Sequence, residues 1–277
     1  MILGDVSFSV QPTFASPEAE SLFLCLRGRQ VLLGQREGIP ALPTYAMVKP
    51  LLPEGLVPFE LAHTDGQEIF VPNPLENWSV EEGNGLCYQN LRAFHSMSFA
   101  QGALLTSANH LWSWYRRSRY CGACGGAMAH HPSERALQCP ACGEIYFPMI
   151  APAVIVAITC GDLILLARNV QSELNHYALI AGYVEVGETL ERAVAREVKE
   201  EVGLTIRDLR YLGDQPWGVS GSMMFAFHAQ ADADAPLTLQ RSEIADAKWV
   251  RREELTPALH PVSIAFELME RFRQGKL

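Results

Sequence analysis

Apolar and polar residues follow two different periods along this chain, and the changes of period mark the elements that it predicts. Residues 151–168 and 178–186 are rich in small and β-branched apolar residues, which indicates strands, with a tight turn at Gly161 and Asp162. Residues 209–217, 222–231 and 244–255 indicate three more strands. Residues 189–202 and 261–273 indicate helices, the second with Pro261 in its first turn. This order predicts a mixed α/β layered domain over residues 148–277.

The first part of the chain predicts a separate α+β domain over residues 1–117. Residues 21–34 indicate a hairpin that turns at Gly28 and Arg29, and residues 57–63 and 68–74 indicate further strands. Between residues 98 and 117, apolar side chains recur three and four positions apart, which predicts an amphipathic helix. No residue pattern in this region points to catalysis.

Length and charge narrow the classes of function. With 277 residues the chain is long enough for two domains, and its net charge of −9 is unlike that of a generic nucleic-acid binder. An acidic protein normally handles phosphates through metal ions and local basic groups, and Arg116, Arg117 and Arg119 form one such group. No apolar run approaches the roughly 18 residues of a spanning helix, and no basic residue precedes Arg27, so we expect a cytoplasmic protein without a membrane segment or signal peptide.

The cysteines predict a metal centre in residues 118–147. Two C-x-x-C pairs, separated by fourteen residues, supply four thiolates, which suit a closed, structural Zn²⁺ site. The ligands would be Cys121, Cys124, Cys139 and Cys142. Reduced or redox-active cysteines are the alternative, and a zinc ribbon of this kind could also bind nucleic acid. The isolated cysteines Cys25, Cys87 and Cys160 are expected to be small buried apolar residues.

The second domain places an acidic cluster on its first helix. If the helix runs from Thr189 to Val202 and ends at Gly203, then Glu197, Glu200 and Glu201 fall within about 100° of one face. Apolar residues four apart form the opposite face, and Arg196 is placed to hold Glu200. Carboxylates that crowd in this way repel one another unless a cation joins them. The pattern therefore favours Mg²⁺ or Mn²⁺ over a merely solvated acidic helix.

The same segment resembles the Nudix box at every fixed position. The matching residues are Gly182, Glu188, Arg196, Glu197, Val198, Glu200, Glu201, Gly203 and Leu204. The resemblance implies a Nudix fold, a mixed sheet sandwiched by helices, and hydrolysis of a nucleoside diphosphate linked to another group. It also implies that the helix glutamates Glu197, Glu200 and Glu201 are catalytic and bind the divalent metal ions, with Glu243 as a further ligand.

The sequence beyond the box resembles NADH pyrophosphatases and NAD-RNA decapping enzymes, which carry a Cys₄ ribbon before the Nudix domain and a Gln-Pro-Trp motif after it. The resemblance implies a substrate loop at Gln215, Pro216, Trp217, Gly218, Val219, Ser220, Gly221 and Ser222. It also implies that Tyr183 stacks on a base, that Ala265 contacts the nucleotide through its backbone, and that Phe147 and Arg92 contact substrate. Gly218, Val219 and Ser220 replace the usual Pro-Phe-Pro, which predicts a more flexible, less apolar loop.

The function that follows is hydrolysis of NADH, and less readily NAD⁺, to AMP and nicotinamide mononucleotide. Removal of NAD caps from RNA is a related activity, which the arginines near residue 117 would assist. The resemblance also implies a homodimer. Two alternatives remain open: a Nudix hydrolase of another substrate such as ADP-ribose, and a non-catalytic nucleotide sensor.

Overall fold

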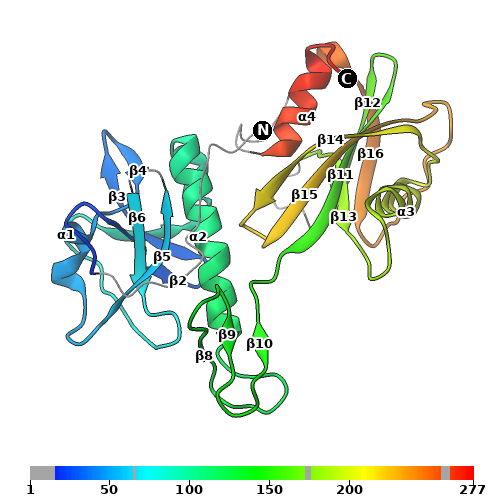
Figure 1. The fold of residues 1–277 in the computed structure, drawn as a ribbon. Coiled ribbons are helices and arrows are strands. Elements are labelled where there is room, and N and C mark those ends of the chain that lie inside the picture. The colour runs from blue at the N-terminus through cyan, green and yellow to red at the C-terminus, as the bar shows by residue number, and fades with distance from the viewer. Residues whose placement is uncertain (1–15, 65–66, 172–175, 257–262) are drawn as a thin grey trace. The chain divides into compact units, whose positions relative to one another are not determined.

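The computed structural model describes residues 16–64, 67–171, 176–256 and 263–277, which are the coloured parts of Figure 1. Two compact units form. Of the described residues, one unit comprises those within 150–217 and 222–277, and the other comprises those within 16–149 together with 218–221. No helix among the described residues is long and apolar enough to cross a membrane.

The C-terminal unit is built on one mixed sheet with the order β14-β15-β11-β12-β16, in which β13 pairs with the first part of β11. Strand β11 pairs in parallel with β15 and antiparallel with β12 and β13. The predicted turn at Gly161 and Asp162 is confirmed by the pairing of Cys160 with Leu163. The elements of this unit are β11 (Ala151–Cys160), β12 (Leu163–Asn169), β13 (Ile180–Tyr183), α3 (Leu190–Val202), β14 (Arg207–Trp217), β15 (Ser222–Gln230), β16 (Ile244–Arg251), a 3₁₀ turn (Arg252–Glu254) and α4 (Ile264–Arg273).

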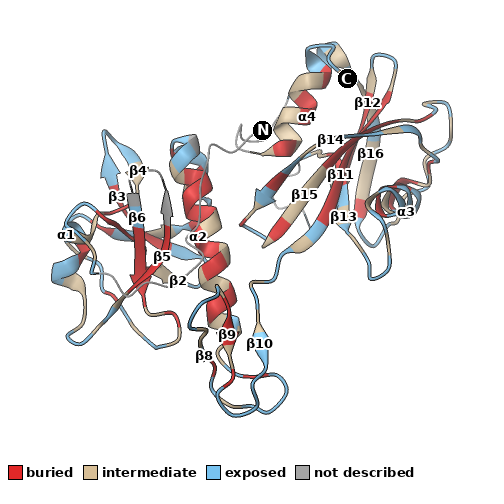
Figure 2. Cartoon of the chain, viewed as in Figure 1, coloured by how far each residue is buried: buried red, intermediate tan, exposed pale blue. Residues whose placement is uncertain are grey.

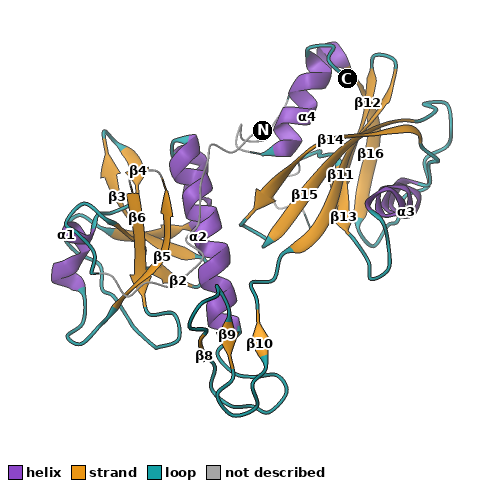
Figure 3. Cartoon of the chain, in the orientation of Figure 1, coloured by secondary structure: helices purple, strands orange, loops and turns teal. Residues whose placement is uncertain are grey.

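Different helices cover the two faces of this sheet (Figures 2 and 3). The buried clusters to which successive residues of β11 belong assign one helix to each face. Val154, Val156 and Ile158 belong to one buried cluster, which includes Val194, Val198 and Val202 of α3. Ile155 and Ala157 belong to a second cluster, which includes Leu268 and Phe272 of α4. Since successive side chains of a strand point to opposite faces, β11 separates an α3 face from an α4 face.

The ends of both helices follow from local sequence. Thr189 caps α3, with its hydroxyl accepting the N–H of Arg192 at 3.4 Å, and Gly203 ends the helix in the left-handed region at φ 77°. A side chain at Gly203 would also collide with Thr238. Helix α4 begins after Ser263, whose hydroxyl accepts the N–H of Phe266. The predicted position of Pro261 in this helix lies outside the described residues.

Over its described residues, the N-terminal unit contains three small sheets and a long helix. The order β1-β6-β5 forms one sheet, β2, β3, β4 and β7 form the second, and β10-β9-β8 forms the third. The predicted hairpin is confirmed between β2 and β3, but Leu22 and Phe23 form a separate strand that runs parallel to β6. The elements are β1 (Leu22–Phe23), β2 (Leu26–Arg27), β3 (Gln30–Arg36), β4 (Ile39–Ala41), α1 (Tyr45–Val48), a 3₁₀ turn (Lys49–Leu51), β5 (Pro58–Thr64), β6 (Gln67–Pro72), β7 (Cys87–Asn90), a 3₁₀ turn (Leu91–Ser96), α2 (Phe99–Arg117), β8 (Ala129–His130), β9 (Leu137–Gln138) and β10 (Ile145–Tyr146).

The cysteine-containing segment packs on the N-terminal strands and on α2 within this unit. The ring of His130 stacks on Phe59 with centroids 4.6 Å apart, and its edge meets Tyr115 of α2. Arg135 donates a hydrogen bond of 2.9 Å to the backbone oxygen of Leu61. Burial lowers the pKa of His130 to about 4, so its imidazole packs as a neutral ring. The segment is therefore part of the same compact unit as α2.

Candidate active site and zinc centre

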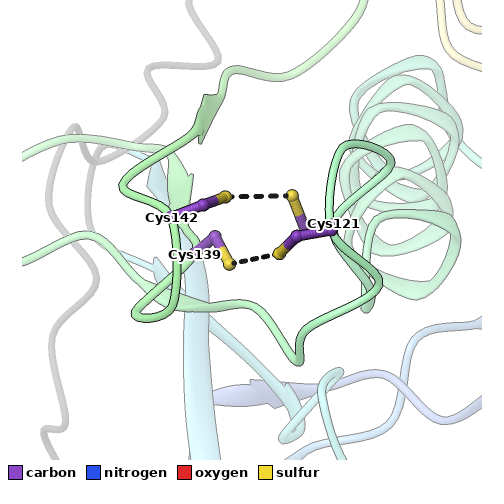
Figure 4. Close-up of side chains that lie close together, drawn as sticks. Cys121, Cys139 and Cys142 are labelled. Carbon is purple, nitrogen blue, oxygen red and sulfur yellow. Dashed lines mark hydrogen bonds between the residues drawn. The ribbon is translucent and has the colours of Figure 1, made fainter.

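The four paired cysteines converge on one point, as Figure 4 shows. Their sulfur atoms all lie within 4.8 Å of one another, with 3.6 Å between Cys121 and Cys142 and 3.5 Å between Cys124 and Cys139. A tetrahedral zinc with Zn–S bonds of about 2.3 Å would hold its sulfurs about 3.8 Å apart. The cluster therefore has the size that a Zn²⁺ ion requires, and His130 is not part of it.

Two matching backbone turns build this cluster. Gly125 donates its N–H to Cys121 O, and Gly143 donates to Cys139 O, with both glycines in the left-handed region at φ 76° and 81°. The backbone N–H of Cys124 lowers the pKa of the Cys121 thiol to about 7, and that of Cys142 lowers the pKa of Cys139. The neighbouring thiols instead raise the pKa of Cys124, and raise that of Cys142 to about 12, so a bound cation is needed for all four sulfurs to be thiolates.

The isolated cysteines differ from one another. Cys25 is buried, as predicted, and burial raises the pKa of its thiol to about 12. Cys160 is half-buried and Cys87 is exposed, so the prediction of burial is wrong for Cys87. Strand β7 contributes Cys87 at an exposed position, which the apolar residues beside it in the sequence did not indicate.

Arg196 is the organising side chain of the acidic cluster. Its Nε and one terminal nitrogen donate to the two oxygens of Glu188, both at 2.9 Å. The other terminal nitrogen donates to Glu197 at 2.8 Å and to Glu200 at 3.0 Å. The fifth N–H donates to the backbone oxygen of Tyr183 at 2.9 Å. All five guanidinium donors are used, and one oxygen of each of Glu197 and Glu200 stays outside this network.

Sequence spacing found only part of this network. It placed Glu200 four residues after Arg196, which the structure confirms. The bidentate partner, however, is Glu188, eight residues earlier and in the loop before the helix. This carboxylate also accepts the N–H of Glu185, and its pKa is lowered chiefly by Arg196. The Nudix box has a fixed glutamate at this position, so the motif singled out Glu188, whereas helical spacing did not indicate it.

Gly182 provides the space in which Glu197 lies. A Cβ built on Gly182 would stand 2.0 Å from the carboxyl carbon of Glu197 and 2.1 Å from one of its oxygens. Gly182 pairs with Val154, a residue of the α3 face, so this carboxyl group lies against the bare backbone of β13 on that face. No side chain larger than hydrogen fits at residue 182 with Glu197 in this position.

Glu201 is the most buried carboxylate of the cluster. It is 8% exposed, and burial first, then Glu197, Glu243 and Glu200, raise its pKa to about 8. Glu243 is held nearby because Gln240 donates its N–H to Glu201 O and Glu243 donates to Gln240 O. Burial also raises the pKa of Glu197, in spite of Arg196. These carboxylates could hold a hard divalent cation, whose positive charge would offset their mutual repulsion. Among the described residues, only the cysteine sulfurs already converge into a compact ligand group.

The opposite, α4 face of the sheet brings several predicted substrate residues into two rows. Strand register aligns Gln215, Met224, Ala153 and Tyr183 across four strands, and aligns Trp217, Ser222 and Ala151 beside them. The hydroxyl groups of Ser222 and Tyr183 are 3.5 Å apart. Tyr183 is 52% exposed, which leaves its ring open for stacking, whereas Ser222 and Gln215 are buried. Ala265 lies in the first turn of α4 and packs at this face.

The other residues predicted to bind substrate lie in β14 or in the N-terminal unit. Pro216 lies in edge strand β14, where a missing N–H is tolerated, and the residues Gly218, Val219, Ser220 and Gly221 group with the N-terminal unit. Arg92 and Phe147 also belong to that unit, with Phe147 60% exposed. Their roles in substrate binding stay predictions.

The arginine patch is partly structural. Arg116 donates to Glu76 O at 2.7 Å and Arg119 donates to the Asn77 side chain at 2.7 Å, so both tie the loop at residue 77 to the end of α2. Their partners are uncharged, and the positive charge of the patch is retained. A variant that removes all three arginines would therefore change the fold of this loop as well as the charge.

Comparison with known proteins agrees with the acidic cluster and, separately, with the cysteine cluster. A NUDIX domain model matches residues 149–272, and a model described as the NADH pyrophosphatase zinc ribbon domain matches residues 116–147. The chain is 37% identical over 212 residues to a protein named NAD-capped RNA hydrolase NudC from Pseudomonas aeruginosa strain LESB58, covering 76% of this chain and 74% of that one. It is 38% identical over 218 residues to the protein of the same name from Pseudomonas putida strain F1, covering 78% of each.

Among solved structures, a NUDIX hydrolase from Nitrosomonas europaea superposes with a TM-score of 0.50 at 18% identity, covering 57% of this chain and 92% of that one. At this identity the likeness concerns the fold alone. It supports the predicted mixed sheet between helices.

Replacing Arg196 by Lys is expected to weaken Mn²⁺ binding about tenfold, because one ammonium group cannot replace five donors fixed in a plane. Titration calorimetry with Mn²⁺ measures the effect. Arg192→Lys, an exposed arginine one turn earlier on the same helix, is the control and should keep the affinity of the parent. Equal affinities for the two variants would contradict the role given to Arg196.

Gly182→Ala is expected to displace the Glu197 carboxyl group and to lower Mn²⁺ affinity by about tenfold, with the fold retained. A double-mutant cycle with Glu197→Ala tests the cause, because the glycine substitution should cost little once that carboxyl group is absent. Additive losses in the double variant would show that the steric explanation is wrong.

The purified chain is expected to contain one zinc ion, and Cys139→Ser should lose it and make residues 118–147 sensitive to protease. Elemental analysis and limited proteolysis give the two readouts. Cys87→Ser, at an exposed cysteine outside the cluster, is the matched control. Full zinc content in the Cys139 variant would exclude the four-sulfur site.

Proposed function

The chain belongs to the Nudix hydrolases, in the family of NADH pyrophosphatases and NAD-capped RNA hydrolases, and from this premise we propose that it cleaves the pyrophosphate of NADH and NAD⁺. The products are AMP and nicotinamide mononucleotide. Removal of NAD caps from RNA is the same cleavage in a larger substrate. The observation that carries the proposal is the acidic cluster of α3, in which Glu201 is buried and the Glu197 carboxyl group lies against Gly182, the residue before half-exposed Tyr183.

The metal ions of the reaction are proposed to be Mg²⁺ or Mn²⁺, held by Glu197, Glu200, Glu201 and Glu243. Three observations support this set: the burial of Glu201, the raised pKa values of Glu197 and Glu201, and the oxygens that Arg196 leaves outside its network. When bound, such ions polarise water for attack on phosphorus and stabilise the leaving phosphate. The Cys₄ ribbon is proposed to have a structural role only, because four sulfur ligands leave no open coordination position on the zinc for a substrate.

The chain's own residues would orient the substrate. Tyr183 offers a flat, half-exposed ring to a base, and the buried hydroxyl of Ser222 lies beside it. The first turn of α4 presents backbone N–H groups at the same face, which supports the assignment of Ala265 as a backbone contact. Arg196 would keep the loop at Glu188 and the helix glutamates in one arrangement, so that metal binding requires little reorganisation.

Three further features belong to the proposal. A domain division at 1–117, 118–147 and 148–277 agrees with the ranges of the two matching family models. A cytoplasmic location suits thiols that must stay reduced to hold zinc. A homodimer rests on the family resemblance, and sedimentation analysis would measure it.

The proposal is tested by offering the purified chain NADH, NAD⁺, ADP-ribose and NAD-capped RNA with Mg²⁺ or Mn²⁺ and separating the products. We expect preferred cleavage of NADH or capped RNA. Glu201→Gln should lower turnover by about 10²- to 10³-fold with the fold intact, because a central metal ligand is lost. Near-normal turnover in this variant would remove the metal assignment, and preference for ADP-ribose would assign the substrate to the alternative class.

A further inference from the structure

The side chain of Gln215 has an unexpected environment for a member of a substrate loop. It is 1% exposed and is the only buried residue along edge strand β14. Its Oε1 accepts the backbone N–H of Ile264, the first residue of α4, at 2.6 Å. A residue that only filled space at this position could be apolar. A buried amide in its place indicates that the hydrogen bond itself is required.

This bond joins two elements that are 49 residues apart in the sequence. The first turn of a helix has four backbone N–H groups without helical partners. In α4, Gln215 accepts that of Ile264, the Ser263 hydroxyl accepts that of Phe266 at 3.2 Å, and the Ser263 backbone oxygen accepts that of Glu267. The next residue, Ala265, is half-exposed and has its backbone N–H in the same first turn.

We propose that Gln215 is a positioning residue, which fixes the first turn of α4 against β14 so that the Ala265 N–H can receive an oxygen of the dinucleotide. The proposal rests on the proposed function for the identity of that ligand. It assigns Gln215 no direct contact with substrate, in contrast to the expectation drawn from the Gln-Pro-Trp motif. The register supports it, because Gln215 lies in the same row as Tyr183 and thus sets the distance from α4 to the stacking ring.

The proposal places this contact on a part of the substrate remote from the reacting phosphorus, so its loss should weaken binding equally in the ground state and the transition state. Gln215→Met retains the length of the side chain and removes the acceptor. In the full-length enzyme we expect this variant to raise KM for NADH about tenfold, with kcat changed less than threefold. Amide hydrogen exchange at residues 264–267 should become faster.

Two further variants separate positioning from other roles. Gln215→Glu retains an acceptor oxygen next to a helix N-terminus and should keep KM within about threefold of the parent. Ser263→Ala removes a different cap of the same helix without breaking the contact with β14, and should change KM less than twofold. A tenfold rise in KM for Ser263→Ala would mean that general loss of α4 stability explains the effect, which overturns the proposal.

Amide hydrogen exchange distinguishes failure of this proposal from failure of the proposed function. If the parent cleaves no dinucleotide, the function fails, while faster exchange at the start of α4 in Gln215→Met still supports the contact. Unchanged exchange in Gln215→Met overturns the proposal whatever the activity. A large fall in kcat with normal KM and normal exchange would show that Gln215 acts on the substrate directly. If Gln215→Met fails to fold, Gln215→Glu decides: a tenfold rise in KM with normal exchange overturns the proposal.

Discussion

The hydrogen-bond network of Arg196 is the constraint on which the active-site half of this protein depends. One guanidinium joins three carboxylates and a backbone oxygen, and these partners come from the loop, the helix and strand β13. Val184 donates its N–H to Pro152 in β11, so the alternation of an antiparallel pair turns the carbonyl of Tyr183 away from β11. Arg196 thus occupies the outer edge of β13 as a further strand would. The acidic helix is fixed to the sheet by the same charge that lowers its repulsion.

The sheet keeps the two kinds of chemistry apart and yet close. Carboxylates lie on the α3 face, against the backbone of Gly182, whereas Tyr183 and Ser222 lie on the α4 face. Consecutive residues of one strand, Gly182 and Tyr183, therefore serve opposite faces. The two edges of β13 are occupied as well, because β11 pairs with one edge and Arg196 donates to the other. A pyrophosphate at this edge would have carboxylate oxygens on one side and an aromatic ring on the other.

In the N-terminal unit, the cysteine-containing segment is stabilised by its sulfur cluster and by contacts with neighbouring strands. The ribbon segment has few apolar residues, and the four sulfurs hold its two turns together. His130 and Arg135 then attach it to the strand residues Phe59 and Leu61. Because the histidine is neutral and stacked, it behaves as an aromatic packing residue. The metal site and the small sheets are thereby joined into one compact unit.

Local spacing in the sequence determined a large part of this structure. The box placed α3, its caps and the acidic face correctly, and the C-x-x-C pairs located the sulfur cluster. Such features are readable because they depend on residues a few positions apart, within one helix or one turn. The alternation of apolar residues likewise identified the strands of the sheet and the turn between β11 and β12.

Only the tertiary structure decided which distant residues meet. The sequence could not show that Leu22 and Phe23 leave the hairpin to pair with β6, that Cys87 is exposed, or that Arg116 holds a loop 40 residues away. Nor could it show that Gln215 is buried against the start of α4. A motif specifies residue types, whereas burial and partners depend on how strands align and helices pack. For this reason the sequence determined the chemistry of the site, and the fold decided which side chains perform it and which hold the others in place.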